Sequence, residues 1–540
     1  MTPFLSWRLW LQRSPVAERL AVAAIGTVLL GLVVWAAVPT GGAGDVASLV
    51  AGPTAPATAG AGSTTAAGSG STTGQVAAGT SGTGSTTGTS GTGSTGAGTT
   101  GAGGTGATGT GASTGSATGA LTGGTTGPVR PGSSCGPAGS TDQGVSATEI
   151  RIDVTLADLQ GSAGNSVVGI PSAAEQQVMF QAALAQANAE GGIHCRRITV
   201  ANFYKVNPLD QTSAPKVCAN IVADKVFALL DEGLGSPVGS SAPRDCPPQH
   251  HIPSFGSLSI SQGELNQFAP YLFGYYPPAE RTVHDSILGA HQLGWFGSRA
   301  KVGLLEQDCI PDLNTVALKD LAAIGYPASS VTTFDFGCPN AIPSPSDVQS
   351  AVLAFQQAGV THVLDDGGVY ENYFSKVAAK ERYRPKYSVG DQGTIALWDN
   401  PAFGPDPQNF DGSLAITGTR YGEERTTGSV PNAATKHCDS AMAKAKEPSS
   451  YTSPDGFSGV VCDLVTMFID GARQAPLLHR DQLANGLASL GTVDLPYPAG
   501  PAYFGDHHGQ VGGGSWRTAI YHADCSCFRI GRSTFARDFR

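Results

Sequence analysis

No cysteine precedes Cys135 in this chain of 540 residues, although ten cysteines occur from that position onward. This absence excludes a bacterial lipoprotein anchor at the N-terminus, because such an anchor is attached to a cysteine. Charged residues make up only 14% of the chain, and the net charge of −10 is spread out with no basic stripe. Nucleic acid is therefore not an expected partner.

Catalytic and metal-binding motifs are missing or incomplete. The metalloprotease motif H-E-x-x-H does not occur, and Ser213 with Lys216 matches S-x-x-K without the K-T-G or S-D-N of serine acylases. The histidine pairs at 250–251 and 507–508 lie in predicted turns rich in proline or glycine, where solvated histidines are common. We therefore expect no enzyme activity, no metal site and no cofactor.

Residues 1–40 are predicted to contain a short cytoplasmic N-terminus and a transmembrane helix. Leu20–Val38 carries no charge and is long enough to cross the hydrocarbon core of a bilayer. Three arginines precede it and only Glu18 opposes them, which orients the N-terminus toward the cytoplasm. A cleaved signal peptide is the alternative, with Val34–Ala36 as a passable cleavage site. Either way the chain after Pro39 is exported, and a retained segment makes it a single-pass cell-membrane protein with an extracytoplasmic folded domain.

Residues 41–130 are a low-complexity segment of glycine, threonine, serine and alanine. It contains no aromatic residue, and Asp45 and Arg130 are its only charges. Such a composition cannot bury enough apolar surface to offset the entropy of ordering, so we predict a disordered linker. A flexible coil of about 90 residues spans roughly 50 Å, which suits a tether that holds a domain away from a membrane.

The remaining residues, 131–540, are too many for one hydrophobic core and suit two lobes. All ten cysteines lie in this exported region, and their even number indicates disulfides. Cys309 and Cys338 each follow a predicted strand, but spacing alone leaves their pairing open. Cys525 and Cys527 lack a second pair at zinc-finger spacing, so disulfides are favoured over a metal site there.

A candidate ligand site lies within the stretch 226–261. Val226–Leu230 and Ile252–Gly256 are short apolar runs that predict two buried strands. Ser236 lies in a glycine-rich turn where the next helix begins, and Ser257 directly follows the second strand. Because ligands bind at the carboxyl ends of strands in open α/β sheets, these loops predict a small-molecule site at one sheet edge.

Two other interpretations of the glycine-rich turn at 233–239 remain. A tight turn without a ligand is one. A dinucleotide-binding turn is disfavoured, since it normally follows the first strand and here the turn follows the third.

The whole region alternates between predicted strands and helices. A first series begins with the strand 150–156, and Ser172 with Glu175 forms a capping box for the helix that follows. A second series begins near Pro278, and a capping box opened by Ser346 starts one of its helices. This alternation predicts an α/β fold in which two Rossmann-like parallel-sheet lobes are joined by a hinge and face each other across a cleft.

At this level the sequence resembles type 1 periplasmic binding proteins, in the branched-chain amino acid (Leu/Ile/Val) receptor branch of ABC importers. The similarity covers about residues 140–530 and rests on the order of five segments. These are EIRIDVTLADLQG, FQAALAQANAEGGIHCRRITV, LLDEGLGSPVGSS with IPSFGSLS, LDDGGVYENYFSKVAAKERYRPKYSVGDQG, and YFGDHHGQVGGGSWRTAIYHAD. The resemblance implies a first lobe of about 148–276 plus 415–505, and a second lobe of about 279–413 plus the C-terminal segment.

The resemblance also implies roles for individual residues. Ser236, with Gly256 and Ser257, corresponds to the family's site for a ligand carboxylate. Tyr370 corresponds to an aromatic residue that closes over the ligand. Gln392 stands where the amino-acid-binding branch places a glutamate that pairs with the ligand ammonium.

Two further residues, Tyr275 and Asp308, are expected near the crossover and the pocket rim. Tyr275 and Tyr370 could equally be core or rim aromatics. The amide of Gln392 cannot supply a charge partner, so an α-amino acid ligand would require Asp391 or Asp366 to replace the glutamate.

These observations predict a membrane-tethered solute-binding protein. Its lobes would close on a small polar solute, amino acid-like, amide or carboxylate, and present it to an ABC transporter permease. A membrane-tethered small-molecule sensor with the same fold is the first alternative. An exported envelope hydrolase is the second, and the lack of a complete catalytic motif counts against it.

Overall fold

The computed structural model describes residues 141–536 with some short segments left out. Those segments are 160, 208–209, 211, 233–241, 257–259, 308–309, 311, 338–342, 366–369, 391–393, 402, 427–429, 450–455 and 506–514. The described residues all belong to one compact unit, Thr126–Arg540. The predicted transmembrane segment and linker lie outside them, and within them no helix is both long and apolar enough to cross a membrane.

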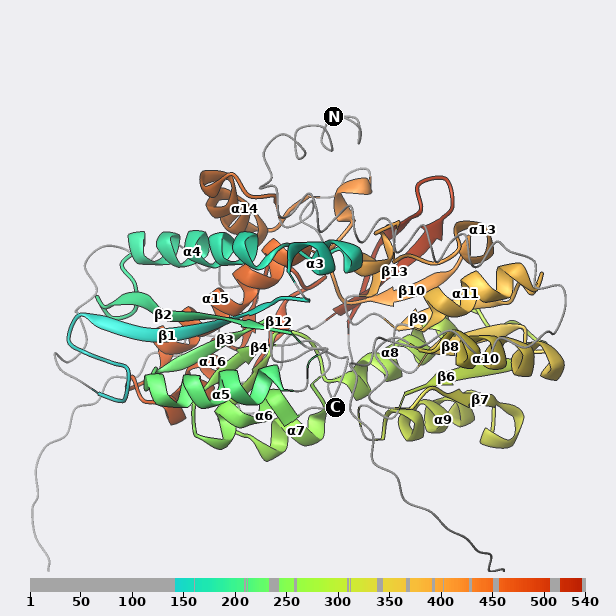
Figure 1. Ribbon diagram of the computed structural model, residues 1–540, viewed down its shortest axis with the longest axis horizontal. Helices are drawn as coiled ribbons and strands as arrows, with labels where there is room; N and C mark the ends of the chain where they lie inside the picture. Colours follow the sequence, from blue (N-terminus) through green and yellow to red (C-terminus); the bar gives the residue numbers. More distant parts are fainter. Residues whose placement is uncertain are drawn as a thin grey trace, which may run out of the picture. The chain divides into compact units, whose positions relative to one another are not determined.

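The first sheet is parallel and has the strand order β2-β1-β3-β4-β5. Its strands follow each other along the chain with helices between them, as the alternating pattern predicts (Figure 1). Their bounds are β1 Glu149–Ala157, β2 Arg197–Val206, β3 Ala228–Asp231, β4 Ser254–Gly256 and β5 Leu272–Gly274.

Helices cover both faces of this sheet. On one face α4 (Ala173–Ala189) packs against β1 and β2, and α15 (Phe457–Gln474) packs against β3 and β4. On the other face lies α5 (Ser213–Asp224). Leu230 joins the core on the α4 side and Leu229 the core on the α5 side, so both faces of β3 are buried. This two-sided burial explains why the chain leading into β3 is a continuous apolar run rather than an alternating one. The remaining helices of this lobe are α3 Ser162–Val168, α6 Ala242–Gln249, α7 Gln262–Gln267, α14 Ala433–Ala445 and α16 Leu483–Leu490.

Helix α4 begins at the predicted capping box. The Ser172 hydroxyl accepts a hydrogen bond from the Glu175 backbone N–H at 3.3 Å, and the Glu175 carboxylate accepts one from the Ser172 N–H at 2.8 Å. Two backbone donors that the helix cannot satisfy internally are thereby paired.

The second sheet has the strand order β14-β13-β10-β9-β8-β6-β7. Strands β7, β6, β8, β9 and β10 are parallel, and the hairpin of β13 and β14 adds two antiparallel strands beside β10. The bounds are β6 Val302–Glu306, β7 Thr332–Asp335, β8 His362–Asp365, β9 Lys386–Gly390, β10 Leu414–Thr417, β13 Ser515–His522 and β14 Cys527–Ala536.

The second sheet is also covered on both faces. Helices α8 and α9 share one hydrophobic core with alternate residues of β6 and β10, while α10 and α11 share the core on the opposite face. The bounds are α8 Ala279–Gln292, α9 Leu313–Ala323, α10 Pro345–Ala358, α11 Glu371–Lys380, α12 Thr394–Trp398 and α13 Pro407–Phe410. The predicted α/β fold with two parallel-sheet lobes is thus confirmed.

The capping residue predicted for α10 is wrong by two positions. The cap is Ser344, whose hydroxyl accepts from the Asp347 N–H at 3.1 Å, and Ser346 lies inside the first turn. Pro345 explains the shift, because proline has no N–H to satisfy and its fixed φ favours the first helical position.

The chain passes between the two lobes three times. The first crossover joins β5 to α8, and the second joins β10 to α14, which packs on α4. The third leads from α16 to β13 and includes the short pair β11 (Thr492–Val493) and β12 (Ala502–Tyr503). Any movement of one lobe against the other must therefore bend these three segments.

Disulfides are present, as the cysteine count predicts. Cys218–Cys246 joins α5 to α6, Cys438–Cys462 joins α14 to α15, and Cys525 bonds to Cys527. The possible partners Cys309 and Cys338 lie outside the described residues, so their pairing stays a prediction.

Candidate functional site

Three of the seven candidate ligand-binding residues fall within the described part of the chain. These are Gly256, Tyr275 and Tyr370, and all three are buried. The other four lie outside it: Ser236, Ser257, Asp308 and Gln392. The strand ends next to these four residues are described.

The carboxyl ends of β3, β4 and β5 lie in line. In the parallel register Asp231 pairs with Gly256, and Gly256 pairs with Gly274. The segments 233–241 and 257–259, which carry the candidate serines, consequently leave from adjacent strand ends. This is the edge of an α/β sheet at which ligands bind.

Gly256 is required by the packing of these strand ends. A Cβ at this position would lie 2.5 Å from the carbonyl oxygen of Asp231 and 2.9 Å from its Cβ. Asp231 is itself buried and accepts a hydrogen bond from the Thr155 hydroxyl at 2.5 Å, which ties β3 to β1. The close approach places the end of β4 directly beside the end of β3.

The loop after β1 is held in place by two buried amides that the sequence interpretation missed. Gln176 Nε2 donates to the carbonyl oxygens of Ala157 and Pro171, at 2.8 Å each. Asn165 Nδ2 donates to the same two oxygens at 2.9 and 2.7 Å, and its Oδ1 accepts from the Leu159 N–H at 2.7 Å. A glutamine at a core-facing position of an otherwise apolar helix face was the signal for this role.

This loop also contacts the second lobe. Asn400 Nδ2, which follows α12, donates to the carbonyl oxygen of Ser166 in α3 at 3.3 Å. Asn400 also packs against Gly169, where a Cβ would lie 3.0 Å from its amide nitrogen. The two lobes therefore meet at the loop after β1 as well as through the crossovers.

Tyr370 lies at the edge of the second sheet. Its N–H donates to the Asp365 carboxylate at 3.2 Å, at the end of β8, and its side chain is 2% exposed. The ring packs against Phe336, with ring centroids 4.4 Å apart. Tyr370 thus follows the carboxyl end of β8, where the sequence resemblance implies a ligand contact. Its ring also belongs to the hydrophobic core.

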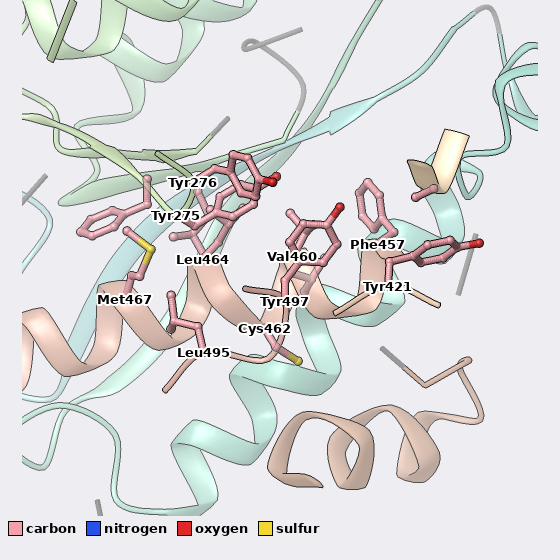
Figure 2. Close-up of a cluster of buried hydrophobic side chains, with 14 of the residues drawn as sticks. Tyr275, Tyr276, Tyr421, Phe457, Val460, Cys462, Leu464, Met467, Leu495 and Tyr497 are labelled. Carbon is pink, nitrogen blue, oxygen red and sulfur yellow. The ribbon is translucent and has the colours of Figure 1, made fainter. Parts of the chain in front are cut away.

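Tyr275 lies in the first crossover, as expected. Its ring meets the rings of Tyr276 and Tyr497 edge-on, at centroid distances of 6.4 and 6.1 Å (Figure 2). The Tyr276 hydroxyl accepts a hydrogen bond from the Gly418 N–H at 3.0 Å. These contacts connect the first crossover to the second and the third.

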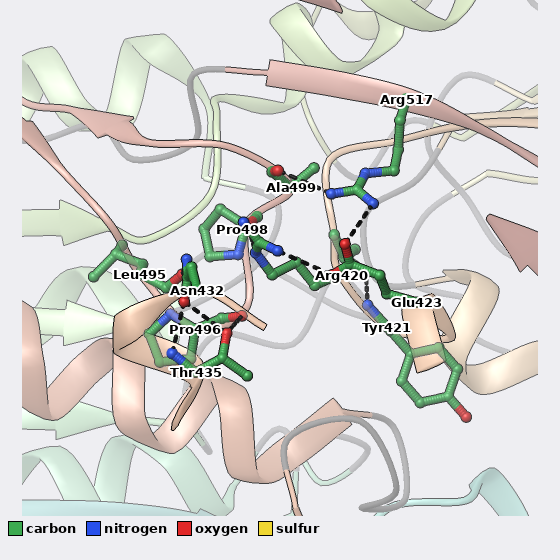
Figure 3. Close-up of polar contacts among 11 residues, drawn as sticks. Arg420, Tyr421, Glu423, Asn432, Thr435, Leu495, Pro496, Pro498, Ala499 and Arg517 are labelled. Carbon is green, nitrogen blue, oxygen red and sulfur yellow. Dashed lines mark hydrogen bonds and ion pairs between the residues drawn. The ribbon is translucent and has the colours of Figure 1, made fainter. Parts of the chain in front are cut away.

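A buried ion cluster joins the second crossover to the third (Figure 3). Glu423 accepts from Arg420 at 3.0 Å and from Arg517 at 3.2 Å. Arg420 Nε also donates to the Pro498 carbonyl at 3.0 Å, and Arg517 to the Ala499 carbonyl at 2.9 Å. Sequence reasoning missed this cluster, because Arg517 is 94 positions from Glu423 and no local motif marks the pair Arg420 and Glu423.

The electrostatics of the cluster favour the charged state. Burial by itself would raise the pKa of Glu423, but Arg420 and Arg517 hold it below its ordinary value. Nearby, burial raises the pKa of Asp463 well above its usual range, and its carboxyl accepts from the Tyr497 N–H at 3.2 Å. The crossover region is thus fixed by polar contacts with defined directions.

The described ends of the two sheets carry buried carboxylates and aromatic rings. Among the residues the structure describes, no group of three or more histidine, cysteine, aspartate or glutamate side chains is arranged to hold a metal ion. The described edge offers backbone groups, buried carboxylates and aromatic rings, which suit hydrogen bonding and packing around a small molecule.

Comparison with solved structures identifies the architecture. Many solved chains match with high probability, among them type 1 periplasmic binding proteins of ABC transporters. The chain has the fold of type 1 periplasmic binding proteins. The resemblance inferred from the sequence segments is thereby confirmed.

Three of these structures illustrate the likeness. The fatty acid ABC transporter substrate-binding protein from Thermomonospora curvata has 16% identity and a TM-score of 0.53, covering 74% of this chain and 95% of that chain. The branched-chain amino acid transporter substrate-binding protein LivJ from Streptococcus pneumoniae, in complex with isoleucine, has 17% identity and a TM-score of 0.51, covering 72% and 99%. An ABC transporter substrate-binding protein from Aeropyrum pernix has 13% identity and a TM-score of 0.53, covering 73% and 97%.

No protein-family model and no curated protein matches the sequence. At these identities the likeness to type 1 periplasmic binding proteins is one of fold. The ligand and the partner must be argued from this chain's own residues.

Proposed function

We propose that this chain is an extracytoplasmic solute-binding protein that captures a small polar solute between its two lobes for an ABC-type importer. The observation that carries the proposal is the architecture of two lobes built on largely parallel sheets, together with its likeness in fold to solved substrate-binding proteins. The adjacent ends of β3, β4 and β5 supply the edge at which the solute binds.

A carboxylate or amide is the proposed recognition feature of the solute. The segments that leave β3 and β4 contain serines and glycines and no lysine or arginine, so recognition rests on hydroxyl and backbone N–H donors. Fatty acid and isoleucine, which two of the similar structures name, both carry a carboxylate. Gln392 provides no negative charge for an ammonium group, so the proposed solute is not restricted to α-amino acids.

The proposed attachment to the membrane rests on the sequence alone. The uncharged segment 20–38 would anchor the protein, and residues 41–130 would serve as its tether. The same tether would also suit a sensor. Loss of solute uptake on deletion of the gene would favour import, while unchanged uptake with a lost transcriptional response would favour sensing.

The first experiment is a thermal-shift screen of the fragment 131–540 against carboxylates, amides and amino acids. A ligand-dependent rise in Tm without turnover supports binding, because a ligand that binds only the folded state stabilises it. Formation of a product would remove the proposal in favour of the hydrolase.

The second experiment tests the candidate serine. Ser236→Ala should weaken a carboxylate ligand by roughly 5- to 150-fold, the equivalent of about 1–3 kcal/mol for a buried hydrogen bond. Ser350→Ala, an exposed serine on α10, is the matched control. Equal affinities for both variants and the parent would reject Ser236 as a ligand contact.

A further inference from the structure

The turn between β13 and β14 carries a disulfide that joins Cys525 to Cys527, two positions apart in the chain. Cys525 is exposed and Cys527 is half-buried, so a solution thiol can reach the bond. Ser526 between them adopts a φ of 49°, in the left-handed region. The proposed solute site does not use this pair.

Two further disulfides join described cysteines and restrain much longer loops. Cys438–Cys462 has a sequence separation of 24, joins α14 to α15 and is buried at both ends. Cys218–Cys246 has a separation of 28, joins α5 to α6, and Cys218 is fully buried. Because the restraint that a disulfide places on the unfolded chain grows with loop length, the bond in the turn contributes less to folding than either of these two.

The turn is held together without its disulfide. His522 and Cys527 are paired across the β13–β14 ladder, and Arg529 and Asp524 form an ion pair at 2.8 Å across the turn. The Phe528 N–H donates to Asp399 at 3.1 Å, which attaches the base of the turn to the rest of the lobe. Reduction would therefore leave the strands in place, with the two thiols near each other and ready to reoxidise.

We propose that Cys525–Cys527 is a thiol–disulfide exchange site that accepts electrons from a dithiol partner. A thiolate of the dithiol attacks the exposed Sγ of Cys525, the Cys525–Cys527 bond breaks, and its electron pair leaves on Cys527 Sγ, which takes up a proton. The second thiol of the dithiol then attacks the first sulfur of the same dithiol, which is bonded to Cys525 Sγ in the mixed disulfide. This attack closes the disulfide of the oxidised reductant and releases Cys525 as a thiol. Two electrons and two protons pass to the cysteine pair, and the dithiol becomes a disulfide.

The test uses the full chain in native buffer, with dithiothreitol as the dithiol. Samples are quenched with iodoacetamide over time, and the alkylated cysteines are identified by peptide mass spectrometry. We expect Cys525 and Cys527 to be alkylated at least about tenfold faster than the four cysteines of the other two disulfides, because exposure governs the attack. Oxidised dithiothreitol should restore the bond, and the Tm should not change on reduction.

Two outcomes would overturn the proposal. One is simultaneous reduction of all three disulfides, or a requirement for denaturant. The other is a loss of Tm in the double variant Cys525→Ser with Cys527→Ser as large as that in Cys438→Ser with Cys462→Ser, since the bond would then be structural. An unchanged Tm in the first variant and a lowered Tm in the second support the exchange site.

Discussion

Replacing Asp153 by asparagine should remove much of the pH dependence of folding stability in the first lobe. Asp153 lies in β1 with no exposed surface, and its carboxylate accepts from the Asn202 N–H at 3.0 Å. Burial, reinforced by the neighbouring charge of Asp224, raises the pKa of Asp153 from 3.8 to about 7. The folded protein therefore favours the protonated carboxyl, and the unfolded chain favours the carboxylate.

The direction and the size of the pH effect on folding stability follow from this difference in pKa. Because the pKa is raised in the folded state, the stabilisation is fully present below pH 3.8 and is lost as the pH rises through about 7. One pKa unit corresponds to about 1.4 kcal/mol, so the total loss is about 4 kcal/mol. Asp153→Asn has no charge to bury at any pH and keeps an oxygen for the Asn202 N–H. The variant should match the parent near pH 4 and exceed it by up to about 4 kcal/mol near pH 8.

The assay is urea unfolding of the fragment 131–540 at a series of pH values from about 4 to about 8, compared with the same series for Asp153→Asn. Asp312→Asn removes an exposed charge in the second lobe and controls for the loss of one negative charge. If Asp153→Asn loses stability with rising pH as steeply as the parent, the buried carboxyl is not the source and the reasoning fails.

Three further predictions concern the site and the crossovers. Gly256→Ala forces a Cβ to within 2.5 Å of a carbonyl oxygen, so it should lower the free energy of unfolding by about 1–3 kcal/mol in urea titrations and weaken solute binding. Glu423→Gln leaves Arg420 and Arg517 without their shared charge, and thermal unfolding should report a loss of about 3–5 kcal/mol. Asn165→Ala leaves the Leu159 N–H without its acceptor, at a cost of about 1–3 kcal/mol, while Gln176 still serves the two carbonyl oxygens; the variant should raise hydrogen exchange in the loop after β1 and leave the crossovers protected.

The sequence was informative wherever local chemistry decides local structure. The runs Val226–Leu230 and Ile252–Gly256 predict strands that overlap β3 and β4, because short apolar runs are typical of parallel strands covered on both faces. Ser172 and Glu175 were recognised as a capping box because the motif is contained within one turn. For α10 the same kind of motif predicts a cap at Ser346, two residues after the actual cap Ser344, because the motif does not account for Pro345 at the first helical position.

Contacts between distant segments could not be predicted in the same way. Arg517 and Glu423 are 94 positions apart, and only the folded arrangement of the crossovers brings them together. The pairing of Cys438 with Cys462 was likewise open, because ten cysteines allow many connectivities. The role of Gln176 was predictable from the sequence. A polar side chain on a buried helix face needs hydrogen-bond partners, and the loop after β1 offers them.

The chemistry of the crossovers determines how the two lobes can move. Tyr276 connects the first crossover to Gly418 in the second, and Glu423 connects the second crossover to Arg517 in β13, where the third crossover ends. Apolar contacts alone would let the segments slide, because they have no preferred direction. Hydrogen bonds and buried ion pairs lose their energy when their geometry changes, so the three segments must bend together. In the proposed solute-binding function, a hinge of this kind would restrict the lobes to one path of closure. The solute would then shift the population along that path by the difference in its affinity for the open and closed forms.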